Sequence, residues 1–336
     1  MYDVAIIGGG PGGYAAALYA HNFGLTVALV EKDQVGGTCL LRGCIPAKSW
    51  LQTAEVYSTV AESADFGVVS APPQVDWPAA LARKQKVVTG LVNGLSGLLK
   101  SRNVDVIDGY GRLVDGGVEV TAAEGAAHRV EARNVIIATG SVPRTIPGYD
   151  IDGTRVVTSD QALDWSAQPS RVAVIGGGVI GCEFASFLSD LGTKVHLFEA
   201  LDSLLPGTEP EAVKVLERRF KKKKVKVHTG TMVGPAQVTA DGVVVPYGDD
   251  SVEVEVVLVA VGRAPVTSDL GLEEAGVTLD AGFVVVDRDT MQTSAPGVYA
   301  VGDIVAGVPQ LAHAGFAEGI SAITHIATAG IAPVDY

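Results

Sequence analysis

Two cysteines lie close together near the start of the chain, in a segment whose residue types could carry redox chemistry. Residues 36–48 read GGTCLLRGCIPAK and contain Cys39 and Cys44. Such a pair could be two unrelated buried thiols, ligands to a metal, or the two halves of a disulfide. Zinc spacing with four cysteines is absent, because only Cys182 remains elsewhere in the 336 residues, and we expect no metal site. A chain of this length buries a sizeable core without a stapling disulfide, so the pair needs a chemical reason.

The spacing of the two cysteines does not suit a regular helix. Residues five positions apart on an ideal helix have Cα atoms roughly 8 to 9 Å apart, whereas a disulfide needs about 4.4 to 6.8 Å. Gly36, Gly37, Gly43 and Pro46 can each bend the backbone and bring the sulfurs together. Disulfides in cytosolic proteins are more often catalytic than structural, so we favour a redox-active pair, with two inert thiols as the alternative.

The elements that must position this pair follow from an internal repeat. Residues 4–32 read VAIIGGGPGGYAAALYAHNFGLTVALVEK, and residues 172–200 read VAVIGGGVIGCEFASFLSDLGTKVHLFEA. The two segments align with each other without a gap. Each copy reads as an apolar strand, a glycine turn, a helix and a second strand that ends in an acid. The glycines allow a tight turn and close approach to a pyrophosphate at the helix N-terminus, and the acid can bind a ribose. The sequence therefore predicts an α/β fold with two Rossmann-like dinucleotide-binding domains.

The two fingerprints are expected to bind different dinucleotides. Glu199 is followed by Ala-Leu-Asp, with no basic residue to receive a 2′-phosphate, so the second site should prefer NAD over NADP. The cysteines begin eight residues after Glu31, so the first domain also carries the redox pair. A flavin can pass electrons to sulfur, whereas a nicotinamide does not readily reduce a disulfide directly. We therefore expect one non-covalent FAD in the first site.

The second repeat lies in mid-chain, between two segments that read as parts of one flavin domain. VIIATGS at 135–141 closes the first part, and VYAVGD at 298–303 lies in the second. We predict an FAD-binding domain formed by residues 1–149 and 270–336, with an NAD-binding domain at 150–269 inserted into it.

With these motifs, the chain resembles the flavoprotein disulfide reductases that have a C-x4-C pair, and among them the dihydrolipoamide dehydrogenases. The resemblance implies that Cys39 exchanges with a substrate dithiol and that Cys44 faces the flavin as a thiolate. It also implies that Lys48 lies beside the flavin, with Glu183 as its ion-pair partner. The first copy of the repeat has Ala15 at the position of Glu183, which favours a special role, although an exposed helix acid is the alternative.

The motifs and the resemblance together predict the cofactor-binding residues. For FAD these are Gly8, Gly10, Pro11, Gly12, Gly13, Glu31, Lys32, Gly37, Thr38, Lys48, Gly111, Thr139, Gly140, Ser141, Asp303, Ala312 and His313. For NAD they are Gly176, Gly178, Val179, Ile180, Gly181, Glu199, Val233, Gly262 and Arg263. Asp303 resembles the aspartate that binds the flavin ribityl chain. His313 is as consistent with a structural hydrogen bond as with proton transfer.

Composition excludes some classes of partner. The net charge of −13 disfavours nucleic acid and anionic membranes, and the basic run KKKK reads as the solvated end of a helix. Charge, proline or glycine interrupts each apolar run before it could cross a bilayer. The first residues, MYDVAIIGGG, have no basic leader, so we expect a cytoplasmic protein.

The resemblance also predicts a partner and a missing part. Its members oxidise dihydrolipoamide, or the lipoyl domain of a 2-oxoacid dehydrogenase complex, with NAD⁺, and they form homodimers through a C-terminal interface domain. That domain carries a histidine and a glutamate that act as acid and base, and none of the six histidines here lies in such a motif. We expect this domain to be absent from a truncated chain with impaired lipoamide chemistry. The alternatives are an NADH-dependent diaphorase or quinone reductase, and a non-catalytic nucleotide-binding module.

Overall fold

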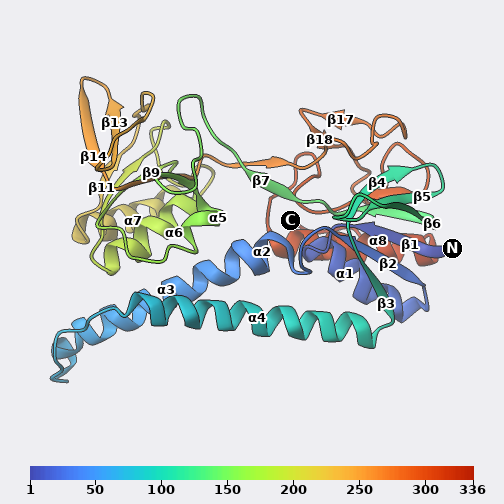
Figure 1. Cartoon of the computed structure of the whole chain (residues 1–336), viewed down its shortest axis with the longest axis horizontal. Helices are drawn as coiled ribbons and strands as arrows, with labels where there is room; N and C mark the ends of the chain where they lie inside the picture. The colour runs from blue at the N-terminus through green and yellow to red at the C-terminus, as the bar shows by residue number, and fades with distance from the viewer. The chain divides into compact units, whose positions relative to one another are not determined.

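The computed structural model describes residues 1–336, and the chain divides into two compact units (Figure 1). The first unit contains Met1–Leu41, Val88–Val142 and Ala264–Tyr336, and the second contains Arg42–Val87 and Pro143–Arg263. The segment Arg42–Val87, which we assigned to the FAD domain, thus packs with the second unit. We drew the predicted domains by the nucleotide that each should bind, whereas the two units are defined by the contacts within each of them. The boundaries of the predicted domains stay a prediction.

The first unit is built around a sheet in which parallel and antiparallel strands share one long strand. Its strands are β1 (Tyr2–Ile7), β2 (Val27–Glu31), β3 (Val104–Asp108), β4 (Tyr110–Val114), β5 (Gly117–Thr121), β6 (Ala127–Ile137) and β19 (Val298–Ala300). The order is β3-β2-β1-β6-β5-β4, and β19 also pairs with β6. β6 pairs with β1 and β19 in parallel and with β5 in antiparallel orientation, so it joins the nucleotide-binding strands to a β-meander.

Helices α1 (Pro11–Ala20) and α8 (Ala312–Thr328) lie side by side in the first unit (Figure 1). Glycines let their backbones approach closely: a Cβ atom on Gly319 would lie 2.3 Å from the Gly12 carbonyl oxygen. A Cβ atom on Gly12 would lie 2.8 Å from the Val301 side chain, just after β19. The start and the end of the first unit are therefore fixed to each other by backbone contact.

The second unit contains a fully parallel sheet and a small antiparallel one. The parallel sheet has the order β11-β10-β9-β15-β8. Its strands are β8 (Val156–Thr158), β9 (Arg171–Ile175), β10 (Lys194–Phe198), β11 (Lys226–His228) and β15 (Val256–Val259). The antiparallel sheet has β12 (Gln237–Val238), β13 (Val243–Tyr247) and β14 (Asp250–Val254). Short strands complete the chain: β7 (Ser141–Pro143), β16 (Arg263–Pro265), β17 (Leu279–Asp280) and β18 (Phe283–Val284).

The remaining helices are α2 (Gly37–Arg42), α3 (Cys44–Ala61), α4 (Trp77–Ser101), α5 (Ser159–Ala162), α6 (Val179–Asp190) and α7 (Pro210–Lys222), with short 3-10 helices at His21–Phe23 and Ser63–Phe66. α7 ends in the basic run, as expected, and its last turn holds Arg219, Lys221 and Lys222. Cations at that end of a helix are stabilised by the negative end of the helix dipole.

The two halves of the sequence repeat form the same structure. Val4 pairs with Val27 between β1 and β2, and the matching Val172 pairs with Val195 between β9 and β10. The strand that follows on the other side is β6 in the first unit and β15 in the second. This repeat of strand, helix and strand confirms the predicted α/β fold class.

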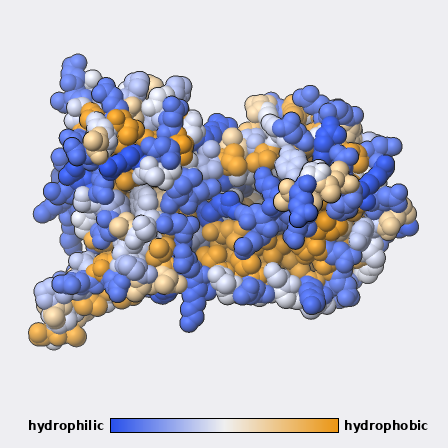
Figure 2. All heavy atoms as spheres, in the orientation of Figure 1, coloured by the Kyte–Doolittle hydropathy of each residue, from blue (hydrophilic) through white to orange (hydrophobic).

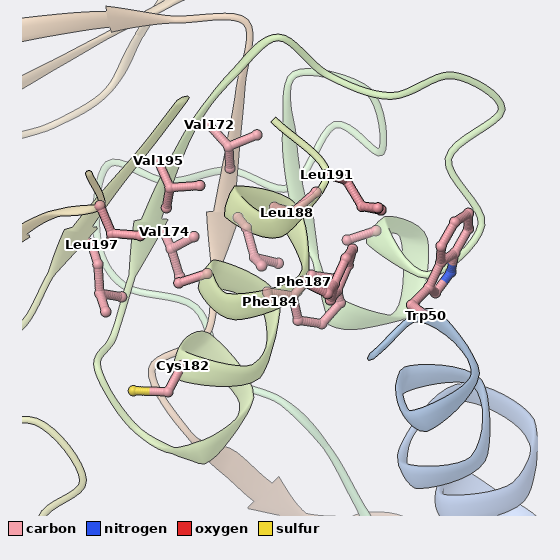
Figure 3. Close-up of a cluster of buried hydrophobic side chains, with 14 of the residues drawn as sticks. Trp50, Val172, Val174, Cys182, Phe184, Phe187, Leu188, Leu191, Val195 and Leu197 are labelled. Carbon is pink, nitrogen blue, oxygen red and sulfur yellow. The ribbon is translucent and has the colours of Figure 1, made fainter. Parts of the chain in front are cut away.

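An aromatic cluster fixes α3 in the second unit (Figure 3). The Trp50 ring of α3 is stacked on Trp77, with ring centroids 4.3 Å apart, and on Phe187 of α6 at 6.0 Å. Its indole Nε1 donates to the Leu163 carbonyl oxygen at 3.1 Å, so the buried polar atom has a partner. This packing explains why α3 belongs to the second unit although it continues the redox segment.

Among the large apolar residues, the two with the highest exposed fraction lie between α3 and α4. Phe66 is 82% exposed and Val69 is 95% exposed. On the face drawn in Figure 2, hydrophilic residues in blue cover much of the surface, with orange hydrophobic patches between them. The longest helix is α4, with 25 residues. Neither α4 nor any other helix combines the length and the apolar character needed to span a membrane.

Candidate active site

The first glycine turn has no room for side chains where the backbone turns, and the helix after it starts without a side-chain cap. Gly8 has φ +106°, and a Cβ atom there would lie 2.3 Å from the Ala138 carbonyl oxygen. A Cβ atom on Gly13 would lie 1.9 Å from the Gly8 oxygen, so α1 packs directly on the turn. Gly10 precedes α1 in an extended conformation, without a side-chain cap. The amide groups at the start of α1 can therefore receive a pyrophosphate.

The acid at the end of β2 is held by backbone amides on both of its oxygens. Glu31 Oε2 accepts from the Gly9 amide at 2.6 Å, and Oε1 accepts from the Asp33 amide at 2.9 Å. Each carboxylate oxygen keeps a further lone pair, so Glu31 can accept hydrogen bonds from a ribose while its orientation is fixed. Next to it, the Lys32 ammonium lies 5.7 Å from the centre of the Tyr110 ring, close enough for a cation–π contact.

The second glycine turn repeats this geometry closely. Gly176 has φ +109°, and a Cβ atom on Gly181 would lie 1.9 Å from the Gly176 carbonyl oxygen. Glu199 Oε2 accepts from the Gly177 amide at 2.7 Å, and Oε1 accepts from the Leu201 amide at 2.8 Å. A Cβ atom on Gly178 would meet nothing within 4 Å, which leaves space for a phosphate group at the start of α6. Both turns thus fit a dinucleotide.

The redox segment begins in contact with the first glycine turn. The Gly36 amide donates to the Gly9 carbonyl oxygen at 2.7 Å. Gly37 has φ +58°, and a Cβ atom there would lie 2.5 Å from Gly10 Cα. Only glycine fits this close approach, so the predicted binding residue Gly37 has a steric reason to be there.

The helix is interrupted between the two cysteines. α2 contains Cys39 and ends at Arg42, Gly43 has φ −142° and ψ −115°, and α3 begins at Cys44. Cys44 is exposed and occupies the first position of an 18-residue helix, where the helix dipole has its positive end. Cys39 is partly buried. The different positions are consistent with different predicted roles for the two sulfurs, which stay predictions.

The third cysteine has the opposite environment. Cys182 is buried in α6, and its Sγ donates to the Gly177 carbonyl oxygen at 3.3 Å. Burial, together with the negative charges of Glu199 and Glu183, raises the pKa of this thiol to about 12. A thiol with such a pKa is a poor nucleophile at neutral pH, so Cys182 is unsuited to exchange.

The structure brings together Lys48 and Glu183, the predicted ion pair. Lys48 lies on α3, one turn after Cys44, and Glu183 lies on α6, just after the second glycine turn. The Lys48 ammonium donates to Glu183 Oε1. The side chains are 59% and 25% exposed, so the pair contributes under about 1 kcal/mol to stability. This small contribution does not explain why the ion pair is present, and its predicted role beside the flavin stays a prediction.

A second predicted group gathers around Asp303 in the first unit. Ser141 Oγ donates to Asp303 Oδ2 at 2.5 Å, so two residues that are far apart in sequence meet. The Thr139 hydroxyl donates to the Val266 carbonyl oxygen at 2.6 Å. Ala312 and His313 form the start of α8, and His313 is exposed.

The other predicted residues lie at element ends. Thr38 lies in α2 and Ile180 in α6, Gly111 is part of β4, and Val233 forms an isolated bridge with Tyr247. Gly262 has φ +107° and its carbonyl oxygen accepts from the Arg144 amide at 2.9 Å. Their contacts with a nucleotide stay predictions.

Arg263 is part of a group of charges in the second unit. Burial raises the pKa of Asp160, at the start of α5, while the positive charges of Arg263 and Arg42 oppose this rise. Arg42 lies between the two cysteines, so this charge group reaches the redox segment. This group could not be predicted from the sequence, because Asp160 lies far from both arginines along the chain.

Sequence reasoning also missed Glu318, a fully buried acid of α8 that accepts from the Gly302 amide. A signal was present, because LAHAGFAEG places one acid in a helix of small and apolar residues. An acid at such a position has to find a buried partner.

Two dinucleotide turns of the same geometry, with a cysteine pair between them in the sequence, define an oxidoreductase that uses two nucleotides and a disulfide. The comparison with known proteins agrees. Residues 2–319 match the pyridine nucleotide-disulphide oxidoreductases, and the chain belongs to this family.

Relatives and solved structures extend over nearly the whole chain. The chain is 40% identical to a dihydrolipoyl dehydrogenase of Bacillus subtilis, covering 99% of this chain and 73% of the relative. It is 38% identical to the dihydrolipoyl dehydrogenase of Chlamydia muridarum, covering 97% and 70%. The crystal structure of LpdA from Mycobacterium tuberculosis superposes with a TM-score of 0.92 at 32% identity, covering 99% of this chain and 74% of that one. A Cu(II) complex of the flavoprotein disulfide reductase RclA from Escherichia coli gives 0.85 at 27%, covering 97% and 70%.

These findings confirm the predicted family resemblance and the two cofactors. The chain is an NAD-dependent flavoprotein disulfide oxidoreductase, and FAD and NAD are the cofactors of this family. The structure fits both, because each glycine turn offers an uncapped helix start and a fixed carboxylate.

Proposed function

We propose that this chain passes electrons between dihydrolipoamide and NAD⁺, with FAD at the first glycine turn and NAD at the second. The observation that carries this proposal is the position of Cys44 at the start of α3, one turn before the Lys48–Glu183 ion pair. The names of the relatives support the same substrate. FAD, when bound, supplies a carrier that exchanges electrons with both the dithiol and the nicotinamide.

The cysteines perform the exchange with the substrate. One thiolate of dihydrolipoamide attacks Cys39 Sγ in the oxidised pair, forms a mixed disulfide, and releases Cys44 as a thiolate. The second substrate thiolate then attacks the substrate sulfur of that mixed disulfide and releases Cys39. The substrate is oxidised to its cyclic disulfide, the cysteine pair is reduced, and two protons leave the substrate.

Residues of the chain favour this direction of release. The positive end of a helix dipole stabilises a nearby negative charge, and Cys44 lies at that end of α3. The start of α3 therefore stabilises the negative charge that the first exchange step creates.

We propose further that the physiological substrate is free dihydrolipoamide or the lipoyl domain of a 2-oxoacid dehydrogenase complex. A homodimer and a cytoplasmic location are proposed with it, from the family resemblance and the sequence. Sedimentation of the purified protein and fractionation of the cells that make it test these two points.

An anaerobic titration tests the proposed function. The protein, loaded with FAD, is titrated with NADH while its absorption spectrum is recorded. We expect reduction beyond that of the flavin alone, with a long-wavelength band from a thiolate next to the flavin, and we expect Cys44→Ser to lose this band. Cys182→Ser is the matched control and should keep it, because Cys182 is a buried thiol of high pKa.

Three results would contradict the proposal. In the first, the band is missing from the wild-type protein. In the second, the wild-type protein reduces a dye with NADH but does not turn over lipoamide, and the dye reduction is retained when both cysteines are replaced, which would favour a diaphorase. Flavin that binds but is never reduced by NADH would instead indicate a module without turnover.

A further inference from the structure

Glu318 is the most deeply buried charged side chain in the chain. It lies in α8 with no exposed surface, whereas the next most buried charged residue, Lys84, keeps 4% of its surface exposed. Burying a carboxylate is costly unless it is hydrogen-bonded, so a buried acid in a helix of small residues needs a specific partner. Neither the electron route nor the nucleotide fingerprints use this residue.

Both oxygens of Glu318 have partners. Oε2 accepts from the Gly302 amide at 2.5 Å, and Oε1 accepts from the Tyr336 hydroxyl at 2.7 Å. The Arg288 guanidinium lies 5.6 Å from the centre of the Tyr336 ring. Hydrogen bonds to a buried carboxylate are among the stronger ones in proteins, so Gly302 is held firmly.

Gly302 needs this acceptor because the sheet no longer supplies one. The Val301 amide still donates to the Ile137 carbonyl oxygen at 3.0 Å, directly after β19. The chain then turns at Gly302, which has φ +81°, and leaves the sheet. A Cβ atom on Gly315 of α8 would lie 3.1 Å from Gly302 Cα, so the helix presses against this turn.

The residue after this turn is Asp303. Its carboxylate accepts from Ser141 at 2.5 Å, and it is the predicted ligand of the flavin ribityl chain. A shift of the Gly302 peptide would move the Asp303 backbone with it. The orientation of Asp303 therefore depends on the acceptor under the turn.

We propose that Glu318 is a positioning residue for the flavin site: its buried carboxylate fixes the Gly302 amide and thereby holds Asp303 in place for the flavin. This inference rests on the proposed binding of FAD at the first glycine turn. Glu318 does not touch the flavin in this proposal, and it acts through the turn.

Replacing Glu318 in two ways tests the proposal. Glu318→Leu removes the acceptor at similar volume, and Glu318→Gln keeps an oxygen that can accept from the Gly302 amide. The dissociation constant of FAD is measured by flavin fluorescence for both variants. We expect a rise of about tenfold or more for leucine and of less than about threefold for glutamine. Glu131→Ala, which removes an exposed acid on β6, is the control and should bind FAD like the wild type.

A double-mutant cycle shows whether Glu318 acts through Asp303. If it does, Glu318→Leu adds little to the loss of FAD affinity already caused by Asp303→Ala. Fully additive losses, or a leucine variant that binds FAD within threefold of the wild type, would overturn the proposal. A general loss of packing would not produce this result. Leucine fills about the same volume as glutamate, so weaker FAD binding by the leucine variant alone, with near-normal binding by the glutamine variant, reports the lost hydrogen-bond acceptor.

Hydrogen exchange of the Gly302 amide keeps the proposal testable if the leucine variant does not fold. In the FAD-free wild-type protein this amide should exchange slowly, and rapid exchange would refute the hydrogen bond on which the proposal depends. A wild-type protein that binds no FAD would refute the proposed function itself. A wild type that binds FAD, with a leucine variant that binds it equally well, would refute only the role of Glu318.

Discussion

A methyl group added to the second glycine turn should abolish tight NAD binding without unfolding the protein. Gly178 has φ −72° and ψ −174°, a conformation open to alanine, and a Cβ atom there meets nothing within 4 Å. We expect Gly178→Ala to change the free energy of unfolding by less than about 1 kcal/mol. The methyl group occupies the space through which a pyrophosphate approaches the backbone. An overpacking cost of about 1 to 3 kcal/mol predicts a roughly 5- to 150-fold weaker affinity for NADH.

Gly181 provides the matched contrast, because its environment is the opposite. A Cβ atom there would lie 1.9 Å from the Gly176 carbonyl oxygen, and α6 would have to move away from the turn. We expect Gly181→Ala to cost about 3 kcal/mol or more of stability. Urea unfolding of the FAD-loaded protein and NADH fluorescence titration separate the two effects. If Gly178→Ala binds NADH as tightly as the wild type does, or if Gly181→Ala is as stable as the wild type, the reasoning is wrong.

Three further predictions concern other parts of the second unit. The Glu199 carboxylate is held by the Gly177 and Leu201 amides at the place where an acid binds a ribose hydroxyl and repels a 2′-phosphate. Glu199→Ala should therefore weaken NADH binding and reduce the preference for NADH over NADPH. The ratio of kcat/KM for the two coenzymes measures this preference, and an unchanged ratio would contradict the prediction. Trp50→Ala should lower the free energy of unfolding by about 3 to 5 kcal/mol, because the ring is 1% exposed in the aromatic cluster; chemical denaturation tests the size of this loss. Burial, with repulsion from nearby positive charge, lowers the pKa of His196 to about 4. The unfolded chain therefore binds its proton first, stability falls as pH decreases from 6.5 towards about 4, and His196→Gln should make this fall shallower in denaturation curves across that range.

The features that could be predicted from the sequence are those in which a few adjacent residues determine the geometry. The spacing of the glycines in each turn follows from backbone contacts within one strand–turn–helix unit, so both turns were predicted and have the same register. The break between the cysteines follows the same logic, because a glycine lies where the first helix ends and the second begins. Local backbone chemistry was sufficient in each case.

Features that depend on distant segments could not be predicted. The Ser141–Asp303 hydrogen bond joins residues far apart in the chain, and nothing near either residue indicates its partner. The sequence indicates that Glu318 needs a buried partner, but only the structure shows that this partner is the Gly302 amide. Likewise, Trp50 packs with the second unit because of aromatic partners that lie more than a hundred residues further on, such as Phe187.

The glycine contact between α1 and α8 affects the order in which the two units can fold while the chain is being synthesised. The second unit has all its segments by Arg263, whereas the first unit still lacks β19 and α8 at that point. While the last segment is being translated, the glycine and alanine face of α1 has no helix to cover it. Domains fold as units, so the NAD side can bury its core on the ribosome while the flavin side waits. The nascent chain should therefore depend on chaperones during this interval, and the first glycine turn should become competent for its nucleotide only after α8 has been made.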